Sequence, residues 1–458
     1  MKEVVNPFDR KKIGEVPTHD WDTINGYLAK AAELHADRSK WLKTHERASI
    51  LEKVVEIMKD RRDHLAMQIA NEGGKPLIDA RVEADRAIKG VELCIEDLGN
   101  VRGTEIPMGL SPSGDGRLAW TSREPIGPVV AVSAFNHPLN LIVHQVCPAV
   151  ATGCPVIVKP AGDTPLSCFE FVDILHEAGL PEDWARAVNP SRDDATKMVT
   201  DPRVAFFTFI GSSKVGWSLR SQLAPGTRCA LEHGGVAPVI VDETADLDSA
   251  VPSLAKGGFY HSGQVCVSVQ RVYAHSSIAE DLANRLSEKA SGLKVGNAIE
   301  EDVECGPLIR PSEVDRVAEW VDEAREGGAK VLTGGEKLGD TTYAPTVLLN
   351  PSDDATISKN EVFGPVVCVY SYDDVDDAIA RANSLDVSFQ AAVFTNDLKA
   401  AMHTYRNINA SAVMVNDHTA FRVDWMPFAG LKTSGHGTGG IPYTMHEMTI
   451  EKMIVINS

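Results

Sequence analysis

Basic side chains are scarce in this chain relative to acidic ones. Its 458 residues include 45 Lys and Arg against 64 Asp and Glu, which gives a formal net charge of −19. Proteins that bind nucleic acid or anionic membranes cluster Lys and Arg on one surface. The charge balance therefore predicts no nucleic-acid partner and no membrane partner.

Long apolar runs are also lacking. The most apolar region, residues 125–159, is interrupted by Asn136, His137, Pro138, Asn140, His144, Gln145, Pro148 and Pro155. A membrane-spanning helix needs about 20 predominantly apolar residues, so this region is expected to form core. The first residues, 1–7, have neither the apolar run nor the small-residue cleavage site of a signal peptide. We predict a cytoplasmic protein.

Paired cysteines are the third absence, because no two cysteines form a Cys-x-x-Cys motif. The eight cysteines are Cys94, Cys147, Cys154, Cys168, Cys229, Cys266, Cys305 and Cys368. Their scattered positions in apolar segments are typical of reduced thiols in a cytosol. We expect neither disulfides nor a metal site.

The length and pattern of the chain predict a multidomain α/β protein. A chain of 458 residues with 43% apolar residues exceeds what one hydrophobic core usually organises. Residues 20–100 have helical periodicity, with Thr44 as a predicted N-cap, and residues 107–120 predict a hairpin or projecting arm.

After residue 125, short apolar runs alternate with helix-like stretches, and such alternation indicates parallel sheets covered by helices on both faces. The first series has expected strands at 129–132, 156–158 and 205–207 and a helix at 167–178. The second has strands at 239–241, 272–273 and 367–370 and helices at 250–261, 279–290 and 375–382. Residues 448–458 alternate like a closing strand.

One cysteine and one glutamate suggest covalent chemistry. Cys266 ends the stretch Gly263-Gln264-Val265-Cys266, and Glu232 precedes His233 and a Gly-Gly pair. A free thiol has a pKa near 8.5, so only about 3% is thiolate at pH 7. A nucleophilic cysteine therefore needs a lowered pKa or a nearby base, which Glu232 could be. The alternative is a buried cysteine and a surface acid.

Eight motifs occur in an order that resembles the aldehyde dehydrogenase superfamily. They are Pro125-Ile126-Gly127-Pro128, Phe135-Asn136, Lys159-Pro160, Gly211-Ser212, Glu232-His233-Gly234-Gly235, Gly263-Gln264-Val265-Cys266, Glu361-Val362-Phe363-Gly364-Pro365 and Pro427-Phe428-Ala429-Gly430. The resemblance implies a Rossmann-like cofactor domain (residues 1–106 and 125–234), an α/β catalytic domain (235–433) and a small β oligomerisation arm (107–124 and 434–458). It also implies a homodimer or homotetramer.

The resemblance assigns catalytic roles to three residues. Cys266 matches the nucleophile, and Asn136 matches the side chain that, with the backbone N–H of Cys266, stabilises the thiohemiacetal oxyanion. Glu232 matches the base that activates water and releases a carboxylic acid. If Glu232 is idle, the alternative is an acylating, coenzyme A-dependent semialdehyde dehydrogenase. A catalytically silent structural homologue is a further alternative, although such relatives commonly lose at least one of these residues.

The same resemblance implies that NAD or NADP binds along a groove. The matching positions are Lys159, Gly162, Gly211, Ser212, Glu361 and Phe363. Lys159 and Glu361 match residues that hold ribose hydroxyls. Gly162 stands where NAD-preferring members usually have a Glu that binds the adenosine 2′-hydroxyl, so both cofactors are admissible.

The expected substrate is a small, polar, anionic or hydroxylated aldehyde, such as lactaldehyde, phosphonoacetaldehyde or glyceraldehyde 3-phosphate. Residues matching the substrate tunnel are His137, Leu141, His144, Arg86 and Arg422. The two arginines match anion-binding positions, while the alternatives are a helix-surface pair of Arg86 with Glu83 and a loop cation at Arg422. His233 replaces the usual Leu, either as a core histidine or as a group that tunes Glu232.

Overall fold

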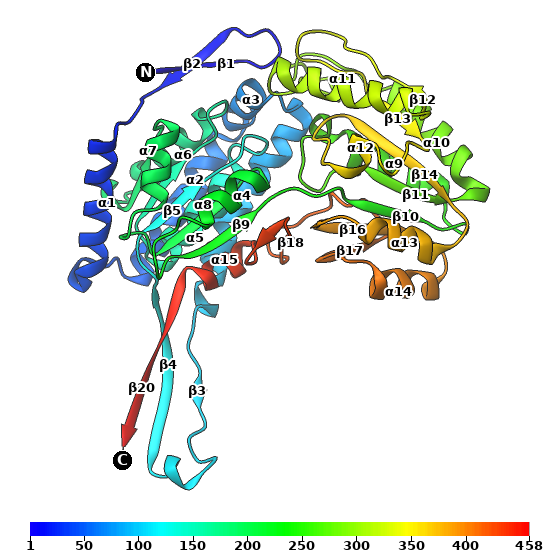
Figure 1. The fold of residues 1–458 in the computed structure, drawn as a ribbon. Helices are drawn as coiled ribbons and strands as arrows, with labels where there is room; N and C mark the ends of the chain where they lie inside the picture. The colour runs from blue at the N-terminus through cyan, green and yellow to red at the C-terminus, as the bar shows by residue number, and fades with distance from the viewer. Residues whose placement is uncertain (458) are drawn as a thin grey trace.

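Two parallel sheets, each covered by helices, form two lobes with an arm projecting below them (Figure 1). The computed structural model describes residues 1–457. The predicted α/β architecture is confirmed, and within residues 1–457 no helix is long and apolar enough to cross a membrane. All eight cysteines are free thiols. No group of His, Cys, Asp and Glu in the described part of the chain has the arrangement of a metal site.

A hairpin and four helices precede the first sheet. Strands β1 (Lys2–Val5) and β2 (Lys12–Val16) pair antiparallel, and the helices are α1 (Trp21–Ala36), α2 (Thr44–Asp60), α3 (Arg62–Gly73) and α4 (Leu77–Asp97). The predicted N-cap of α2 is wrong by one residue. Lys43 is the cap, because the Glu46 carboxylate accepts its backbone N–H at 2.6 Å, and Thr44 is already helical.

The first sheet has the order β19-β9-β8-β5-β6-β7, and only β19 runs antiparallel. Its strands are β5 (Val129–Val132), β6 (Val156–Lys159), β7 (Ala185–Ala187), β8 (Phe206–Ile210), β9 (Arg228–Glu232) and β19 (Gly435–His436), with helices α5 (Asn140–Thr152), α6 (Leu166–Glu177), α7 (Arg192–Val199) and α8 (Ser213–Arg220). The central strands are buried on both faces, which is why they are continuous apolar runs rather than alternating ones.

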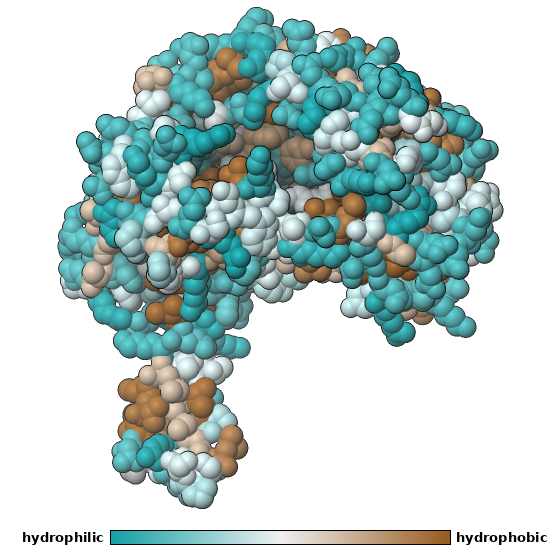
Figure 2. Space-filling view, viewed as in Figure 1, coloured by the Kyte–Doolittle hydropathy of each residue, from teal (hydrophilic) through white to brown (hydrophobic). Residues whose placement is uncertain are grey.

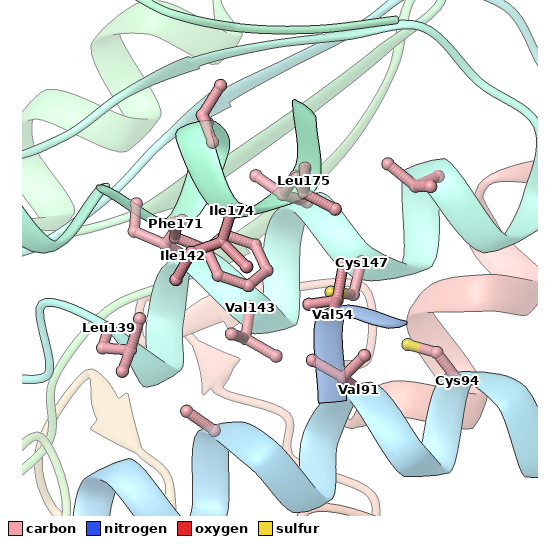
Figure 3. Close-up of a cluster of buried hydrophobic side chains, with 14 of the residues drawn as sticks. Val54, Val91, Cys94, Leu139, Ile142, Val143, Cys147, Phe171, Ile174 and Leu175 are labelled. Carbon is pink, nitrogen blue, oxygen red and sulfur yellow. The ribbon is translucent and has the colours of Figure 1, made fainter. Parts of the chain in front are cut away.

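Helix α5 is buried along its whole length and fixes the loop before it. Figure 3 shows how side chains from α2, α4, α5 and α6 interlock around it, among them Val54, Val91, Val143 and Phe171. Burying each such side chain stabilises the fold by about 1.5–3 kcal/mol. The segment 136–140 that leads into α5 is therefore held in place by this core.

The second sheet has the order β12-β13-β14-β11-β10-β16-β17, and only β12 runs antiparallel. Its strands are β10 (Pro238–Val241), β11 (Arg271–His275), β12 (Lys330–Thr333), β13 (Thr346–Leu349), β14 (Val366–Tyr372), β16 (Gln390–Phe394) and β17 (Ala412–Val415). The helices are α9 (Leu247–Phe259), α10 (Ser276–Ser291), α11 (Pro311–Glu326), α12 (Thr356–Lys359), α13 (Val375–Asn383) and α14 (Leu398–Asn407). A two-stranded ribbon, β15 (Val387–Ser388) with β18 (Leu431–Lys432), lies between the lobes.

The arm is a three-stranded antiparallel sheet of β3 (Glu105–Ile106), β4 (Arg117–Pro125) and β20 (Thr449–Asn457). Residues 434–458, which were expected to belong to the arm, contribute only β20 to it. Strand β19 joins the first sheet, and α15 (Ile441–Glu447) packs on α4 and α5. Figure 2 shows that the arm carries apolar residues on its surface. Exposed ones are Leu110, Leu118, Trp120, Met453, Ile454, Val455 and Ile456.

Candidate active site

A cavity of about 410 Å³ lies between the two lobes and gathers most of the predicted site residues. Loops that follow β5, β8 and β9 supply one wall, and residues near 266, 361 and 422 supply the other. The predicted residues on its surface are Arg86, Asn136, His137, Leu141, Gly162, Gly211, Ser212, Glu232, Cys266, Glu361, Phe363 and Arg422. Lys159 and His144 do not line it.

Cys266 follows a strained turn, η5 (Tyr260–Gly263). His261 and Ser262 have positive φ angles of 46° and 55°, and Gly263 has 70°. A β-carbon at position 263 would collide with the Gly364 carbonyl, so this turn requires glycine there. Strain of this kind is concentrated at functional sites.

The Cys266 thiol is protonated in the free protein, because burial raises its pKa to about 12. Nearby Glu361 and Glu232 raise the pKa further, while Arg422 lowers it. The free protein therefore does not supply the lowered pKa that a nucleophilic cysteine can use. The thiol needs a base or a bound ligand to become a thiolate.

The Asn136 amide is held beside the nucleophile. Its Nδ2 donates a hydrogen bond to the Gln264 carbonyl at 2.9 Å, and its exposed fraction is 5%. Gln264 is fixed in turn, since its Oε1 accepts the backbone N–H of Ile309 at 3.0 Å. An amide nitrogen has two N–H groups, so one remains to bind an oxyanion.

Glu232 ends β9 at the floor of the cavity. Burial raises the pKa of Glu232, and the Arg422 guanidinium opposes that rise. A β-carbon at Gly439 would collide with the Glu232 carboxylate, so that glycine makes the room in which the carboxylate lies. Glu232 and Cys266 line the same cavity, and within residues 1–457 no hydrogen bond joins them.

Arg422 is the buried cation of the cavity. The guanidinium carbon lies 3.5 Å from the centre of the Phe428 ring, and its Nε has no hydrogen-bond partner within residues 1–457. Its nearest carboxylate oxygen, on Asp424, is 3.9 Å from Nε. Burial lowers the pKa of Arg422, while Glu232 and Asp424 raise it. Its Nη2 lies 3.5 Å from His144 Nδ1, so Nε is the group's N–H that lacks a hydrogen-bond partner. A guanidinium whose hydrogen bonds are incomplete is suited to an anionic ligand.

Asp424 is a site residue that the sequence pattern did not reveal. Burial favours its neutral form, but His144 at 2.8 Å and a two-point pair with Arg86 hold the pKa of Asp424 well below its usual range. Its partners come from positions 280 and 338 residues away, which no local motif can indicate.

These contacts correct two sequence-based interpretations. Arg86 does not pair with Glu83, because Glu83 forms a buried ion pair with Lys75 and accepts the backbone N–H of Leu139 at 3.0 Å. His144 does not form the tunnel wall; it lies behind the cavity, bound to Asp424.

His137 lines the cavity as a neutral imidazole. Burial lowers its pKa well below the ordinary value, and the cations Lys75, Arg86 and Arg422 lower it further. Its Nε2 lies 3.4 Å from the Tyr260 hydroxyl. His137 is therefore suited to hydrogen bonding and not to charge.

The groove residues fit a dinucleotide. Glu361 has an Oε1 that is buried without a partner, and burial raises its pKa to about 8. A β-carbon at Gly234 would collide with this carboxylate, so glycine makes its place. A buried acceptor without a donor fits the hydroxyls of a cofactor ribose. The Phe363 ring packs edge-on against Phe135, 5.7 Å between centres.

His233 supports the turn between β8 and α8. Its Nδ1–H donates to the Gly211 carbonyl at 2.8 Å, and its ring packs against Phe209 and Trp217. A β-carbon at Gly216 would lie 2.7 Å from His233 Nε2, so only glycine admits the ring. The histidine thus contacts the Gly211-Ser212 turn, which faces the cavity.

Comparison with known proteins identifies the class. The profile of the aldehyde dehydrogenase family matches residues 1–454, and the chain belongs to this family. It is therefore an oxidoreductase that oxidises an aldehyde with NAD or NADP.

Individual relatives cover nearly the whole chain. The chain is 37% identical to 3-sulfolactaldehyde dehydrogenase of Priestia aryabhattai over 99% of its own length and 94% of the relative's. Two solved structures are similar. Aldehyde dehydrogenase 21 from Physcomitrella patens, in complex with the reaction product succinate, has a TM-score of 0.96, 36% identity and coverage of 100% and 95%. Glyceraldehyde-3-phosphate dehydrogenase GapN from Methanocaldococcus jannaschii, complexed with NADP, has a TM-score of 0.95, 33% identity and coverage of 100% and 99%.

Proposed function

We propose that the enzyme oxidises a small anionic aldehyde to its carboxylic acid, with Arg422 binding the anion. The observation that carries this proposal is the unpaired, buried Nε of Arg422 in the same cavity as Cys266. Arg86 lies in the same wall, but Asp424 already neutralises it, so its role is to position the loop that carries Arg422.

The reaction begins with attack of the Cys266 sulfur on the aldehyde carbon. The thiol proton leaves through water to bulk solvent, so that Glu232 stays ionised, and the carbonyl oxygen becomes an oxyanion. The free Asn136 N–H and the backbone N–H of Cys266 stabilise that charge. Loss of one such donor typically costs about 100- to 1000-fold in rate. NAD or NADP, when bound, accepts the hydride, which leaves an acyl thioester on Cys266.

Glu232 then decides the product. A buried carboxylate with a raised pKa can take a proton from water, and the hydroxide attacks the thioester to release the acid and the thiol. The presence of Glu232 in the same cavity as Cys266 supports hydrolysis over transfer to coenzyme A. The retention of Cys266, Asn136 and Glu232 in one cavity argues against a silent homologue.

The relatives support an anionic substrate. The curated relatives include 3-sulfolactaldehyde, sulfoacetaldehyde and aspartate-semialdehyde dehydrogenases, and each of these aldehydes carries an anionic group at neutral pH. Lactaldehyde dehydrogenase of Methanocaldococcus jannaschii, 35% identical, is a relative with a neutral hydroxyaldehyde substrate. Arg422 is the residue that we expect to separate these two substrate classes.

The assembly and location are further parts of the proposal. We infer that residues 1–106 and 125–234 bind the cofactor, that 235–433 supply the nucleophile, and that the arm of 107–124 with the C-terminal strand joins subunits into a homodimer or homotetramer. The exposed apolar side chains of the arm support this assembly. The eight free thiols support a cytoplasmic location.

The test compares matched aldehydes with and without an anionic group. For Arg422→Ala, kcat/KM for sulfoacetaldehyde should fall by about 100-fold or more, because a charge-assisted contact is lost, while acetaldehyde should change less than about threefold. Arg422→Lys should retain part of the anionic preference. Arg406→Ala, the same charge change on the exposed helix α14, is the control. Equal losses for both aldehydes would show that Arg422 is structural.

A further inference from the structure

One face of helix α4 carries three charged side chains, Asp79, Glu83 and Arg86. Their spacing of four and then three residues places them on the same side of the helix. Asp79 and Glu83 are 3% and 1% exposed, although acidic side chains are rarely buried unless they have partners. The contacts of this face therefore show which parts of the protein α4 holds together.

The middle residue of the three, Glu83, binds the start of helix α5. Its Oε1 accepts the backbone N–H groups of Leu139 at 3.0 Å and Asn140 at 3.1 Å. The first N–H groups of a helix have no partner inside that helix, and the cap residue Leu139 has no side-chain acceptor to offer. The carboxylate also lies at the positive end of the helix dipole. Glu83 thus fixes the start of α5 from a different helix.

The proposed oxyanion donor, Asn136, lies only three residues before Leu139. Pro138 stiffens the segment between them, because its ring fixes the φ angle. At the other end, the Asn136 Nδ2 donates to the Gln264 carbonyl at 2.9 Å. Because Glu83 holds Leu139, the short segment leaves the backbone of Asn136 little freedom to move.

Lys75 supplies the counter-charge for Glu83. The two side chains form an ion pair in which both are 0% exposed. The two carboxylate oxygens have separate partners: Oε2 accepts from the Lys75 ammonium, and Oε1 accepts from the start of α5. A buried carboxylate without a cation would be strongly destabilising. The lysine therefore allows a full charge to be used at this buried position.

The other two charges on this face of α4 contact the remaining segments of the site. Asp79 accepts a hydrogen bond from the backbone N–H of His261, in the turn that precedes Cys266. Arg86 forms its two-point pair with Asp424, in the loop after β17. One helix face thus contacts the segments that carry the nucleophile, the oxyanion donor and the proposed anion site.

We propose that Glu83 is a positioning residue of the oxyanion hole. Its carboxylate holds the start of α5 and, through that start, the amide of Asn136. Glu83 acts through Asn136 and not on the aldehyde, since it does not line the cavity. This inference rests on the proposed oxyanion role of Asn136, but it does not depend on an anion bound by Arg422.

The test is a double-mutant cycle on the rate of the first turnover, measured by stopped flow as cofactor reduction. The probe is whichever of sulfoacetaldehyde and lactaldehyde the wild type oxidises faster, at saturating aldehyde and cofactor. The pair variant Lys75→Met/Glu83→Gln removes both charges, so that no buried charge is left unpaired. It should lower the rate about tenfold in the wild type but less than about twofold in Asn136→Ala, because its effect passes through that amide.

Glu72 provides a matched control, because it binds the start of α6 in the same way. Its two carboxylate oxygens accept the backbone N–H groups of Leu166 at 2.7 Å and Ser167 at 2.8 Å. Helix α6 does not carry Asn136, so Glu72→Gln should leave the rate of the first turnover within about twofold of the wild type. The Tm of each variant is measured alongside, so that a loss of rate can be compared with a loss of stability.

The outcomes separate this inference from the assignment on which it rests. An equal loss of rate from the pair variant in the wild type and in Asn136→Ala would overturn the role of Glu83 alone. No loss in the wild type, or a loss matched by Glu72→Gln, would overturn it as well. If Asn136→Ala itself costs less than about tenfold, the oxyanion assignment is wrong, and this inference fails with it.

Discussion

Arg86 on α4 and Asp424 in the loop after β17 form a two-point ion pair between the lobes, with Nη2 to Oδ1 at 2.6 Å and Nε to Oδ2 at 3.1 Å. The loop that carries Asp424 also carries Arg422. The pair therefore holds the loop that places the Arg422 guanidinium beside Cys266. The proposed anion site and the lobe contact depend on this one carboxylate.

Replacement of Asp424 should weaken both the contact between the lobes and the binding of anionic aldehydes. Asp424→Asn leaves the half-buried Arg86 without its counter-ion, and loss of one partner of a buried ion pair typically costs up to about 3–5 kcal/mol. We expect a lower Tm by calorimetry and a raised KM for anionic aldehydes. Adding Arg86→Met to Asp424→Asn should restore part of the stability, because the unpaired charge is removed. If the double variant is less stable than the single one, the ion pair is not the cause.

Replacement of Glu232 should separate the two halves of the reaction. In Glu232→Gln, an ionised general base is absent, so thioester hydrolysis should slow by about 100- to 10,000-fold. A burst of reduced cofactor and an acyl adduct on Cys266 by mass spectrometry are the expected readouts. Hydrolysis at the wild-type rate in this variant would exclude Glu232 as the base. Addition of coenzyme A tests the acylating alternative, since free acid should remain the wild-type product.

Alkylation of Cys266 should depend steeply on pH. Its pKa of about 12 in the free protein means that the thiolate fraction rises about tenfold for each pH unit between 7 and 10. Iodoacetamide labelling, followed by peptide mass spectrometry, should therefore be slow at pH 7, and its rate should rise in proportion to the thiolate fraction. A labelling rate that is already independent of pH near 8 would show a lowered pKa instead.

His233 should affect cofactor binding more than chemistry. His233→Leu removes the hydrogen bond to the Gly211 carbonyl, so the turn at Gly211-Ser212 loses its support. We expect KM for the cofactor to rise about threefold to tenfold with kcat nearly unchanged. Gly216→Ala should lower the Tm in the wild type because its β-carbon meets the imidazole. A large fall in kcat with unchanged KM in His233→Leu would instead indicate a role at Glu232.

The arm should control the oligomeric state. Val455→Asp places a charge among the exposed apolar residues of β20 and should produce smaller species in light scattering at micromolar concentration. Lys452→Ala, which also lowers the net charge by one on the same strand, is the matched control for net charge. An unchanged mass for Val455→Asp would place the subunit contact elsewhere.

The sequence predicted features whose cause is local. Each apolar run of the two sheets became a strand, and the motifs around Asn136, Glu232 and Cys266 met in one cavity. Two-residue strands such as β15 and β18 have no period to detect, so they were not predicted. The helix start at Lys43 depends on a side chain three residues away and was misplaced by one position.

Long-range partners were the other limit. Asp424 lies 338 residues from Arg86, and its carboxylate decided that Arg86 is neutralised and that His144 lies behind the cavity. A motif can identify a residue type that the chemistry needs, but it does not show which charged side chains surround that residue in the fold.

Strand β20 pairs with β4 along its full length, from Thr449 opposite Pro125 to Asn457 opposite Arg117. More than three hundred residues separate the two strands, so during synthesis one edge of β4 stays unpaired until β20 leaves the ribosome. Both α/β lobes can be built in that interval. The arm is therefore completed only after both lobes have been synthesised, and a chain that stops before β20 carries a half-made, apolar ribbon that quality control can recognise.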